Sequence, residues 1–169
     1  MSTAQMRAES TPRSTVKRPL AKLESALAQI EREMAEHYDW LAKVFSADAA
    51  ARGFFAAMAE AEREHERLVQ LEFRLAGKRR DMAVSVDVAD LRSTFADIHG
   101  FRSTTPRPTL KDALEFSLDL EDSAAEEHAG TALASVDPSL AGFIQRLASD
   151  DHQHAKALRE FRDSQPPGG

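Results

Sequence analysis

Two short carboxylate–histidine pairs are the feature of this chain that most constrains its fold. Glu62 precedes His65 by three residues, and Asp151 precedes His154 by the same spacing later in the chain. Residues three apart lie on one face of a helix, so each pair can present an oxygen and a nitrogen to the same point. Apolar residues recur at helical spacing around both pairs. We therefore expect two helices that carry charged groups on their inward faces.

Two further helical segments each carry a single carboxylate within an otherwise apolar stripe. These carboxylates are Glu31 and Glu121, which are separated by 90 residues, and His154 follows His65 by 89 residues. The order is the same in both halves, with the lone carboxylate first and the carboxylate–histidine pair second. We interpret this pattern as an internal repeat, whose pseudo-twofold axis would bring both sets of residues to one centre.

Four long helices are expected from the apolar spacing and the end signals. The first should span about 19–46 and the second about 48–76, with Asp48 as its N-cap and Gly77 just beyond its end. The third should begin after Thr109, where Asp112 completes a capping box. The fourth should begin at Asp137, which is followed by a proline at the first helical position.

The connection between the second and third helices, residues 78–108, has no long amphipathic pattern. It contains a β-like stretch from Val84 to Val88 and the pattern of a short helix near 88–98. So long a connection allows the second and third helices to run parallel. The predicted fold is all-α, an antiparallel four-helix bundle over 18–163 with 78–108 as its crossover. Polar residues without periodicity predict a disordered N-terminal tail, 1–17, and a flexible tail, 164–169.

Composition narrows the functional classes. The 169 residues suit one domain, and the absence of cysteine excludes disulfides, thiolate-ligated metals and thiol catalysis. A formal net charge of −6 disfavours nucleic acid as a partner, because binding to phosphates relies on cationic side chains. The sequence has no apolar run long enough for a membrane span and no apolar core of a secretory signal near its start. We therefore expect a cytoplasmic protein with no membrane or nucleic-acid partner.

Six charged or histidine residues within the apolar stripes make a ligand set for two metal ions. They are Glu31, Glu62, His65, Glu121, Asp151 and His154. Four carboxylates in an apolar interior would repel one another, and some would have to take up protons. Two divalent ions supply four positive charges against the four negative ones. Oxygen and nitrogen ligands without thiolate suit iron, manganese or zinc. Iron would add redox chemistry with O₂ or H₂O₂, whereas zinc would add none, and the ligand types alone leave the choice among the three metals open.

Other polar residues near the stripes have more ordinary expected roles. Tyr38 follows Glu31 by two helical turns, so its hydroxyl is placed to bond a ligand carboxylate or to remain a half-buried core group. His128 occupies the matching position in the second half and is expected to be a core histidine or a support for a ligand. The remaining histidines, His37, His99 and His152, are expected at the surface or in local contacts.

The chain resembles the ferritin-like superfamily, and within it the rubrerythrin-like proteins. The resemblance lies in ALAQIEREMAEHYDWL, AEAEREHERL, ALEFSLDLEDSAAEEH and LASDDHQHAKAL, which belong to the region 20–163. It implies a di-iron centre that reduces peroxide, oxidises Fe(II) or stores iron, and it implies a tyrosine near that centre, here Tyr38. The metal ligands it implies are Glu31, Glu62, His65, Glu121, Asp151 and His154.

Three departures from that family pattern affect the expected chemistry. Asp151 stands where the pattern has glutamate, so its side chain is one methylene shorter. Ala124 stands three residues after Glu121, where classical rubrerythrins carry an extra glutamate, which argues against their redox-linked ligand exchange. Without cysteine there is no rubredoxin-type iron site, so the electrons would come from a separate donor protein.

Three functions remain open at this point. The first is a di-iron oxidoreductase of peroxidase or ferroxidase type, acting on O₂ or H₂O₂. The second is a metal-binding or storage protein without turnover, holding zinc or manganese. The third is a metal-free helical-bundle interaction module. Because relatives often pair their bundles, a homodimer is one of the expected assemblies.

Overall fold

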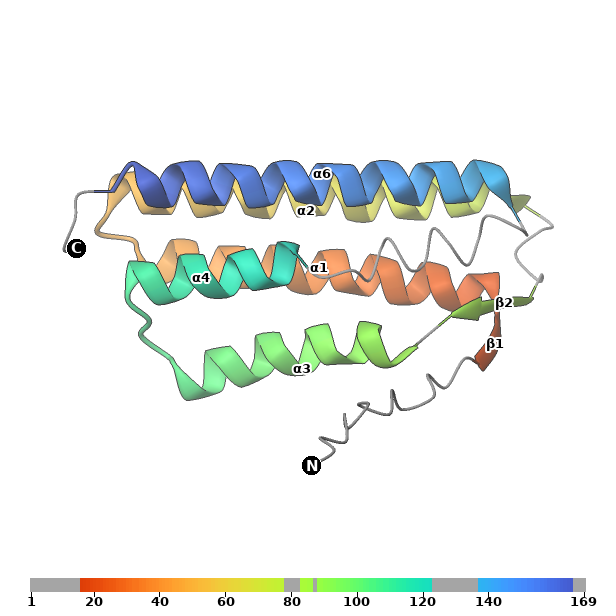
Figure 1. The fold of residues 1–169 in the computed structure, drawn as a ribbon, viewed down its shortest axis with the longest axis horizontal. Helices are drawn as coiled ribbons and strands as arrows, with labels where there is room; N and C mark the ends of the chain where they lie inside the picture. Colours follow the sequence, from red (N-terminus) through yellow and green to blue (C-terminus); the bar gives the residue numbers. More distant parts are fainter. Residues whose placement is uncertain (1–15, 78–82, 87, 123–136, 166–169) are drawn as a thin grey trace, which may run out of the picture.

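The computed structural model describes residues 16–77, 83–86, 88–122 and 137–165 of the chain. This part of the protein is helical, as predicted, with a short two-stranded ribbon added (Figure 1). Its elements are β1 (Val16–Pro19), α1 (Leu20–Val44), α2 (Ala49–Leu75), β2 (Ala83–Val86), α3 (Val88–Thr104), α4 (Leu110–Glu121) and α6 (Pro138–Asp163). The expected continuation of the third long helix beyond 122 lies outside the described residues.

Local end signals fix where α2 begins and ends. The Asp48 carboxylate accepts hydrogen bonds from the backbone N–H groups of Ala50 and Ala51, at 2.9 and 3.0 Å. These bonds satisfy two of the donors that a helix leaves unpaired at its first turn. At the other end Gly77 adopts a φ of 57°, a left-handed conformation that glycine takes without steric cost. Both predicted end signals are confirmed.

The starts of α4 and α6 also follow from their sequences. The Thr109 hydroxyl accepts from the Asp112 N–H at 3.1 Å, and the Asp112 carboxylate accepts from the Thr109 N–H at 3.0 Å. This reciprocal pair is the predicted capping box. The Asp137 carboxylate caps α6 by accepting hydrogen bonds from the backbone N–H groups of Ser139 and Leu140, and Pro138 occupies the first turn of the helix.

The long helices lie alongside one another (Figure 1). The connection 45–48 reverses the chain, so α1 and α2 are antiparallel and pack along most of their lengths. Helix α3 packs on α1 and returns the chain to the end where α2 begins, and α4 starts from that end. Helix α6 runs back against α4 and also contacts α2. This order brings α1, α2, α4 and α6 to a common interior.

A continuous apolar core fills that interior. Its largest fully buried side chains include Phe55, Phe73, Leu114 and Ile144, which come from α2, α4 and α6. Burying a side chain of this size stabilises a fold by about 1.5–3 kcal/mol. The core also encloses ionisable groups from the middle of the helices, so the apolar helix faces hold the charged residues at fixed positions.

The two-stranded ribbon corrects the predicted boundaries. Strand β1 pairs with β2 in an antiparallel register, with Val16 opposite Val86 and Pro19 opposite Ala83. The predicted N-terminal tail, 1–17, therefore extends two residues too far, because Val16 and Lys17 belong to a strand. The β-like stretch is confirmed in part, and the short helix near 88–98 is longer than predicted, ending at Thr104. Strands of four residues carry too little pattern to be recognised before their partner is known.

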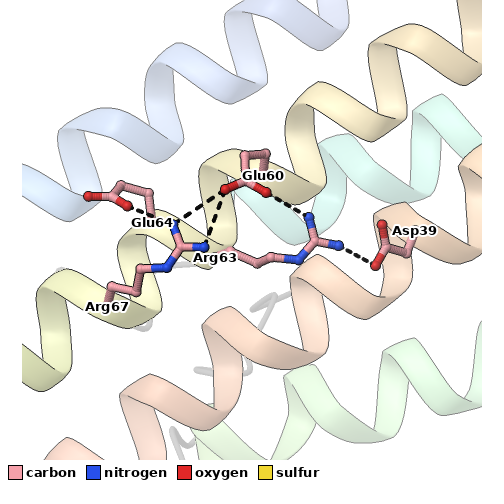
Figure 2. A network of polar contacts seen from close by, with 5 residues as sticks. All are labelled: Asp39, Glu60, Arg63, Glu64 and Arg67. Carbon is pink, nitrogen blue, oxygen red and sulfur yellow. Dashed lines mark hydrogen bonds and ion pairs between the residues drawn. The ribbon is translucent and has the colours of Figure 1, made fainter.

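A surface network of ion pairs joins α1 to α2 (Figure 2). The Arg63 guanidinium contacts Asp39 on α1 and donates to Glu60 on its own helix at 3.0 Å. Arg67 donates to Glu64 at 2.9 Å and to Glu60 at 3.3 Å. Exposed pairs of this kind contribute at most about 1 kcal/mol each. The Arg63–Asp39 contact joins the two helices, whereas the contacts to Glu60 and Glu64 lie within α2.

Among the described helices, none has the length and apolar composition needed to cross a membrane.

Candidate metal centre

Ionisable side chains from four helices meet inside the protein. Three of their carboxylates are nearly inaccessible to solvent, with exposures of 3% for Glu31, 1% for Glu62 and 5% for Glu121. The six residues come one or two from each helix: Glu31 from α1, Glu62 and His65 from α2, Glu121 from α4, and Asp151 and His154 from α6. The structure thus gathers all six residues selected from the sequence.

Glu62 lies between the two histidines. Its Oε2 atom is 3.3 Å from Nδ1 of His65, and its Oε1 atom is 3.0 Å from Nδ1 of His154. The two imidazole rings lie nearly parallel, with centroids 5.2 Å apart and an angle of 19° between their planes. One carboxylate thus contacts the Nδ1 atoms of both rings, each through a different oxygen.

The outer carboxylates repeat this geometry on each side. Glu31 Oε2 lies 3.6 Å from Nδ1 of His65, and Glu121 Oε2 lies 3.6 Å from Nδ1 of His154. The two halves of the predicted repeat therefore contribute equivalent contacts to one centre. The Nδ1 atom of each histidine faces Glu62, which both histidines share, and one further carboxylate. This carboxylate is Glu31 for His65 and Glu121 for His154.

Asp151 completes a compact group with Glu62, His65 and His154. One donor atom from each of these four residues lies within 4.8 Å of the others. The Asp151 Oδ1 atom is 4.0 Å from His65 Nδ1, which is the longest of the contacts to that nitrogen. Metal–ligand bonds of about 2.0–2.2 Å place neighbouring donor atoms roughly 3–3.5 Å apart. The shorter separations in the centre already match this range, and the Asp151 separation is slightly wider.

Unpaired buried atoms show that the residues fit a metal. Glu62 Oε1, His65 Nδ1 and His154 Nδ1 are all inaccessible and have no hydrogen-bond partner of good geometry. Nδ1 of His154 is close to Glu62 Oε1, yet its direction does not make a hydrogen bond. Buried polar atoms without partners are costly, so they are rare in folded proteins. A cation among these atoms would satisfy all three.

Shifted pKa values compensate part of the charge of the centre. Burial alone would lower the pKa of His65, but Glu31 and Glu62 outweigh it and raise the pKa to about 11. Glu121 and Glu62 similarly outweigh burial at His154 and raise its pKa to about 10. Burial alone would raise the pKa of Glu62, but His154 and His65 outweigh it and lower the pKa to about 2. Without metal, both imidazoles are therefore protonated on both nitrogens and positively charged at neutral pH.

These shifts set the pH range in which the charged centre stabilises the metal-free fold. The folded-state pKa values of the histidines exceed the ordinary 6.5, so their contribution is complete below about pH 6.5 and is lost as pH rises through 10 to 11. The pKa of Glu62 lies below the ordinary 4.5, so its contribution is present above about pH 4.5 and is lost toward pH 2. The histidine and Glu62 contributions are therefore both complete only between about pH 4.5 and pH 6.5.

Metal binding at pH 7 is expected to release about two protons per chain, because a histidine ligand must be neutral. The apparent affinity for Co²⁺ should accordingly increase with pH. Isothermal titration calorimetry in buffers of different ionisation enthalpy measures the number of protons released. Replacing the exposed His152 with glutamine should leave that number unchanged, whereas His154→Gln should reduce it by about one. Binding of Co²⁺ without proton release would contradict the predicted charge state.

Tyr38 lies against the centre from α1. Its fully buried hydroxyl donates a hydrogen bond to Glu121 Oε1. Burial raises the pKa of Tyr38 well above 10, and the carboxylates of Glu121 and Glu62 raise it further. The phenol therefore stays protonated and orients the Glu121 carboxylate across the helix interface.

The structure adds one residue that the sequence did not identify and corrects the interpretation of another. Asp150 Oδ2 lies 3.9 Å from Nε2 of His65, the nitrogen that does not face Glu62. A carboxylate that accepts a hydrogen bond at this nitrogen orients a metal-binding histidine, but 3.9 Å is longer than such a bond. In the sequence, Asp150 is marked only by its position directly before Asp151. His37, expected at the surface or in a local contact, is completely buried, and His128 lies outside the described residues.

The centre is most accessible on the α6 side. The Asp151 and His154 side chains are each 15% exposed, and Asp150 is 47% exposed. The carboxylates from α1, α2 and α4 lie deeper. Of the six candidate ligands, the two from α6 are therefore the most exposed to solvent.

Comparison with known proteins finds no matching family model, no similar curated protein and no similar solved structure.

Proposed function

We propose that this chain is a ferritin-like, rubrerythrin-like protein that binds two iron ions in the core of a four-helix bundle. In this interpretation α1, α2, α4 and α6 are the four bundle helices, and 78–108 is the crossover that contains α3. The observation that carries the proposal is the position of Glu62 between two histidines, with a further carboxylate at each histidine. Glu31, Glu62 and His65 would hold one ion, and Glu62, Glu121 and His154 the other, with Asp151 on the accessible side.

The proposed activity is oxidation of Fe(II) or reduction of O₂ or H₂O₂. Bound iron would supply the one-electron redox chemistry, which zinc would not supply. The residues of this chain supply the remainder. Glu62 keeps the two positions adjacent, Tyr38 holds the Glu121 carboxylate through its hydroxyl, and the apolar core excludes bulk water from the deep side. Electrons for repeated turnover would come from a separate donor protein.

An anaerobic Fe(II) titration tests this proposal. We expect saturation at about two Fe(II) per chain, followed by oxidation on addition of H₂O₂ with about one peroxide consumed per two ions. Reduction of one H₂O₂ to two waters takes two protons and two electrons, so this ratio reports complete reduction. Failure to bind iron, or binding without an absorbance of oxidised iron after peroxide, would remove the oxidoreductase proposal.

Asp151 favours a second candidate, a metal-binding or storage protein without turnover. Its side chain is one methylene shorter than glutamate, and its separation from His65 Nδ1 is wider than those of Glu31 and Glu62 from the same atom. A weakly held second ion would limit two-electron chemistry. Steady-state peroxide consumption with a chemical electron donor would contradict this candidate, and tight binding of Zn²⁺ or Mn²⁺ without such turnover would support it.

A further inference from the structure

A groove between α3 and α4 lies apart from the candidate metal ligands, none of which lines it. Its volume is about 540 Å³, which is within the range of small-molecule sites, about 300–1,000 Å³. Phe101 on α3 and Phe116 on α4 both line it and are only partly buried. The groove therefore presents aromatic surface to solvent at a helix–helix interface.

The aromatic surface is rigid. The Phe101 and Phe116 rings stack in parallel, with centroids 4.0 Å apart and an angle of 3° between their planes. Beneath them lies the ring of His37, which packs edge-on against both, at 6.0 Å from Phe101 and 5.3 Å from Phe116. Burial lowers the pKa of His37 to about 3, and the nearby Arg102 adds to this effect. The imidazole is therefore neutral, and the positive charge close to it is that of Arg102.

Two exposed carboxylates also line the groove, Asp97 from α3 and Asp119 from α4. Neither forms an ion pair with a cation in the part of the chain that the structure describes. Some other exposed acidic residues do have such partners, for example Glu115 with Lys111 on α4 and Glu160 with Lys156 on α6. Negative charge without a protein counter-ion thus accompanies an aromatic surface.

We propose that this groove binds an alkylammonium group, with its carbon atoms on the Phe101 and Phe116 rings and its charge facing Asp97 and Asp119. Because the two rings cover each other's inner faces, the ligand would contact an outer face. The face of an aromatic ring attracts a cation through its quadrupole, and organic ammonium ions combine this attraction with apolar contact. An inorganic cation would gain little from the phenylalanines because it prefers oxygen ligands. A neutral apolar ligand would gain nothing from the carboxylates. The combination selects a ligand that is both cationic and apolar.

The chain contains its own reporter for this site. Trp40 is the single tryptophan, and its ring packs perpendicular to Phe101 at 6.2 Å. Titration with choline should change the Trp40 fluorescence in a saturable manner. The neutral isostere 3,3-dimethylbutan-1-ol should bind at least about tenfold more weakly, because it has the same shape without the charge.

Two variants test the groove itself. Asp97→Asn combined with Asp119→Asn should weaken choline binding at least about tenfold, whereas Asp163→Asn, an exposed residue of α6, should have no effect. Gly100 also lines the groove, and a Cβ there would meet no atom within 4 Å. Gly100→Leu should therefore fold normally and reduce choline binding by occupying the groove.

Calorimetry provides the second measurement. Absence of both heat and fluorescence change with choline would overturn the proposal, as would equal binding of the neutral alcohol or equal binding by the doubly substituted variant. The same titration on Glu62→Gln protein separates this site from the metal centre. Unchanged choline binding in that variant is expected, because the groove does not depend on the metal ligands.

Discussion

Replacing Glu62 with glutamine should reduce metal binding from about two ions per chain to less than one. Among the described residues, Glu62 is the carboxylate that contacts the Nδ1 atoms of both histidines, at 3.3 and 3.0 Å. Glutamine has nearly the same shape, so the packing of the buried side chain is preserved while its negative charge is lost. Both ion positions should lose affinity together, in contrast to a substitution of Glu31 or Glu121. Metal analysis after equilibrium dialysis against Co²⁺ or Fe(II) measures the change.

The neighbouring Glu64 provides a matched control for this substitution. It lies two residues away on the same helix, but it is exposed and pairs with Arg67. Glu64→Gln removes the same charge from α2 and should leave the metal content unchanged. Equal metal content in Glu62→Gln and the unmodified protein would show that the centre is assigned to the wrong residues.

Removal of metal should lower the melting temperature by about 5–10 °C. A ligand that binds only the folded state at 100 times its Kd stabilises that state by about 2.7 kcal/mol. For a domain of this size, 1 kcal/mol corresponds to about 2–4 °C in Tm. The unpaired Glu62, His65 and His154 atoms give a physical reason for the effect, because metal satisfies them and neutralises the clustered carboxylates. Differential scanning calorimetry of chelator-treated protein, with and without added metal, measures the shift.

The Glu62→Gln variant again serves as the control, since its Tm should respond little to metal. This measurement also decides between the remaining functions. A Tm that is independent of Fe(II), Mn²⁺ and Zn²⁺ would favour the metal-free interaction module. A response to Zn²⁺ or Mn²⁺ without peroxide turnover would favour the metal-binding protein without redox activity.

The sequence determined the helices and the residues that approach the interior. Glu62 and His65 share a helical face because they are three residues apart, and the apolar neighbours on that face require it to be buried. Capping residues such as Asp48 and Asp137 marked helix starts because they satisfy local backbone donors. These are short-range effects, and they act before any tertiary contact forms. The ribbon between β1 and β2 was not recognised because its pairing joins residues about 70 positions apart, beyond the range of a local pattern.

Only the tertiary structure decided which groups face one another across helices. The sequence selected Tyr38 but not its partner, which is Glu121 on α4. It placed Asp150 next to a candidate ligand without revealing its approach to His65, and it predicted a surface or local contact for His37, which is buried beneath two phenylalanines. Helical periodicity gives the direction of a side chain relative to its own axis, whereas contacts between helices depend on their axial shift and rotation. Those quantities are set by the packing of the whole core, which no single segment encodes.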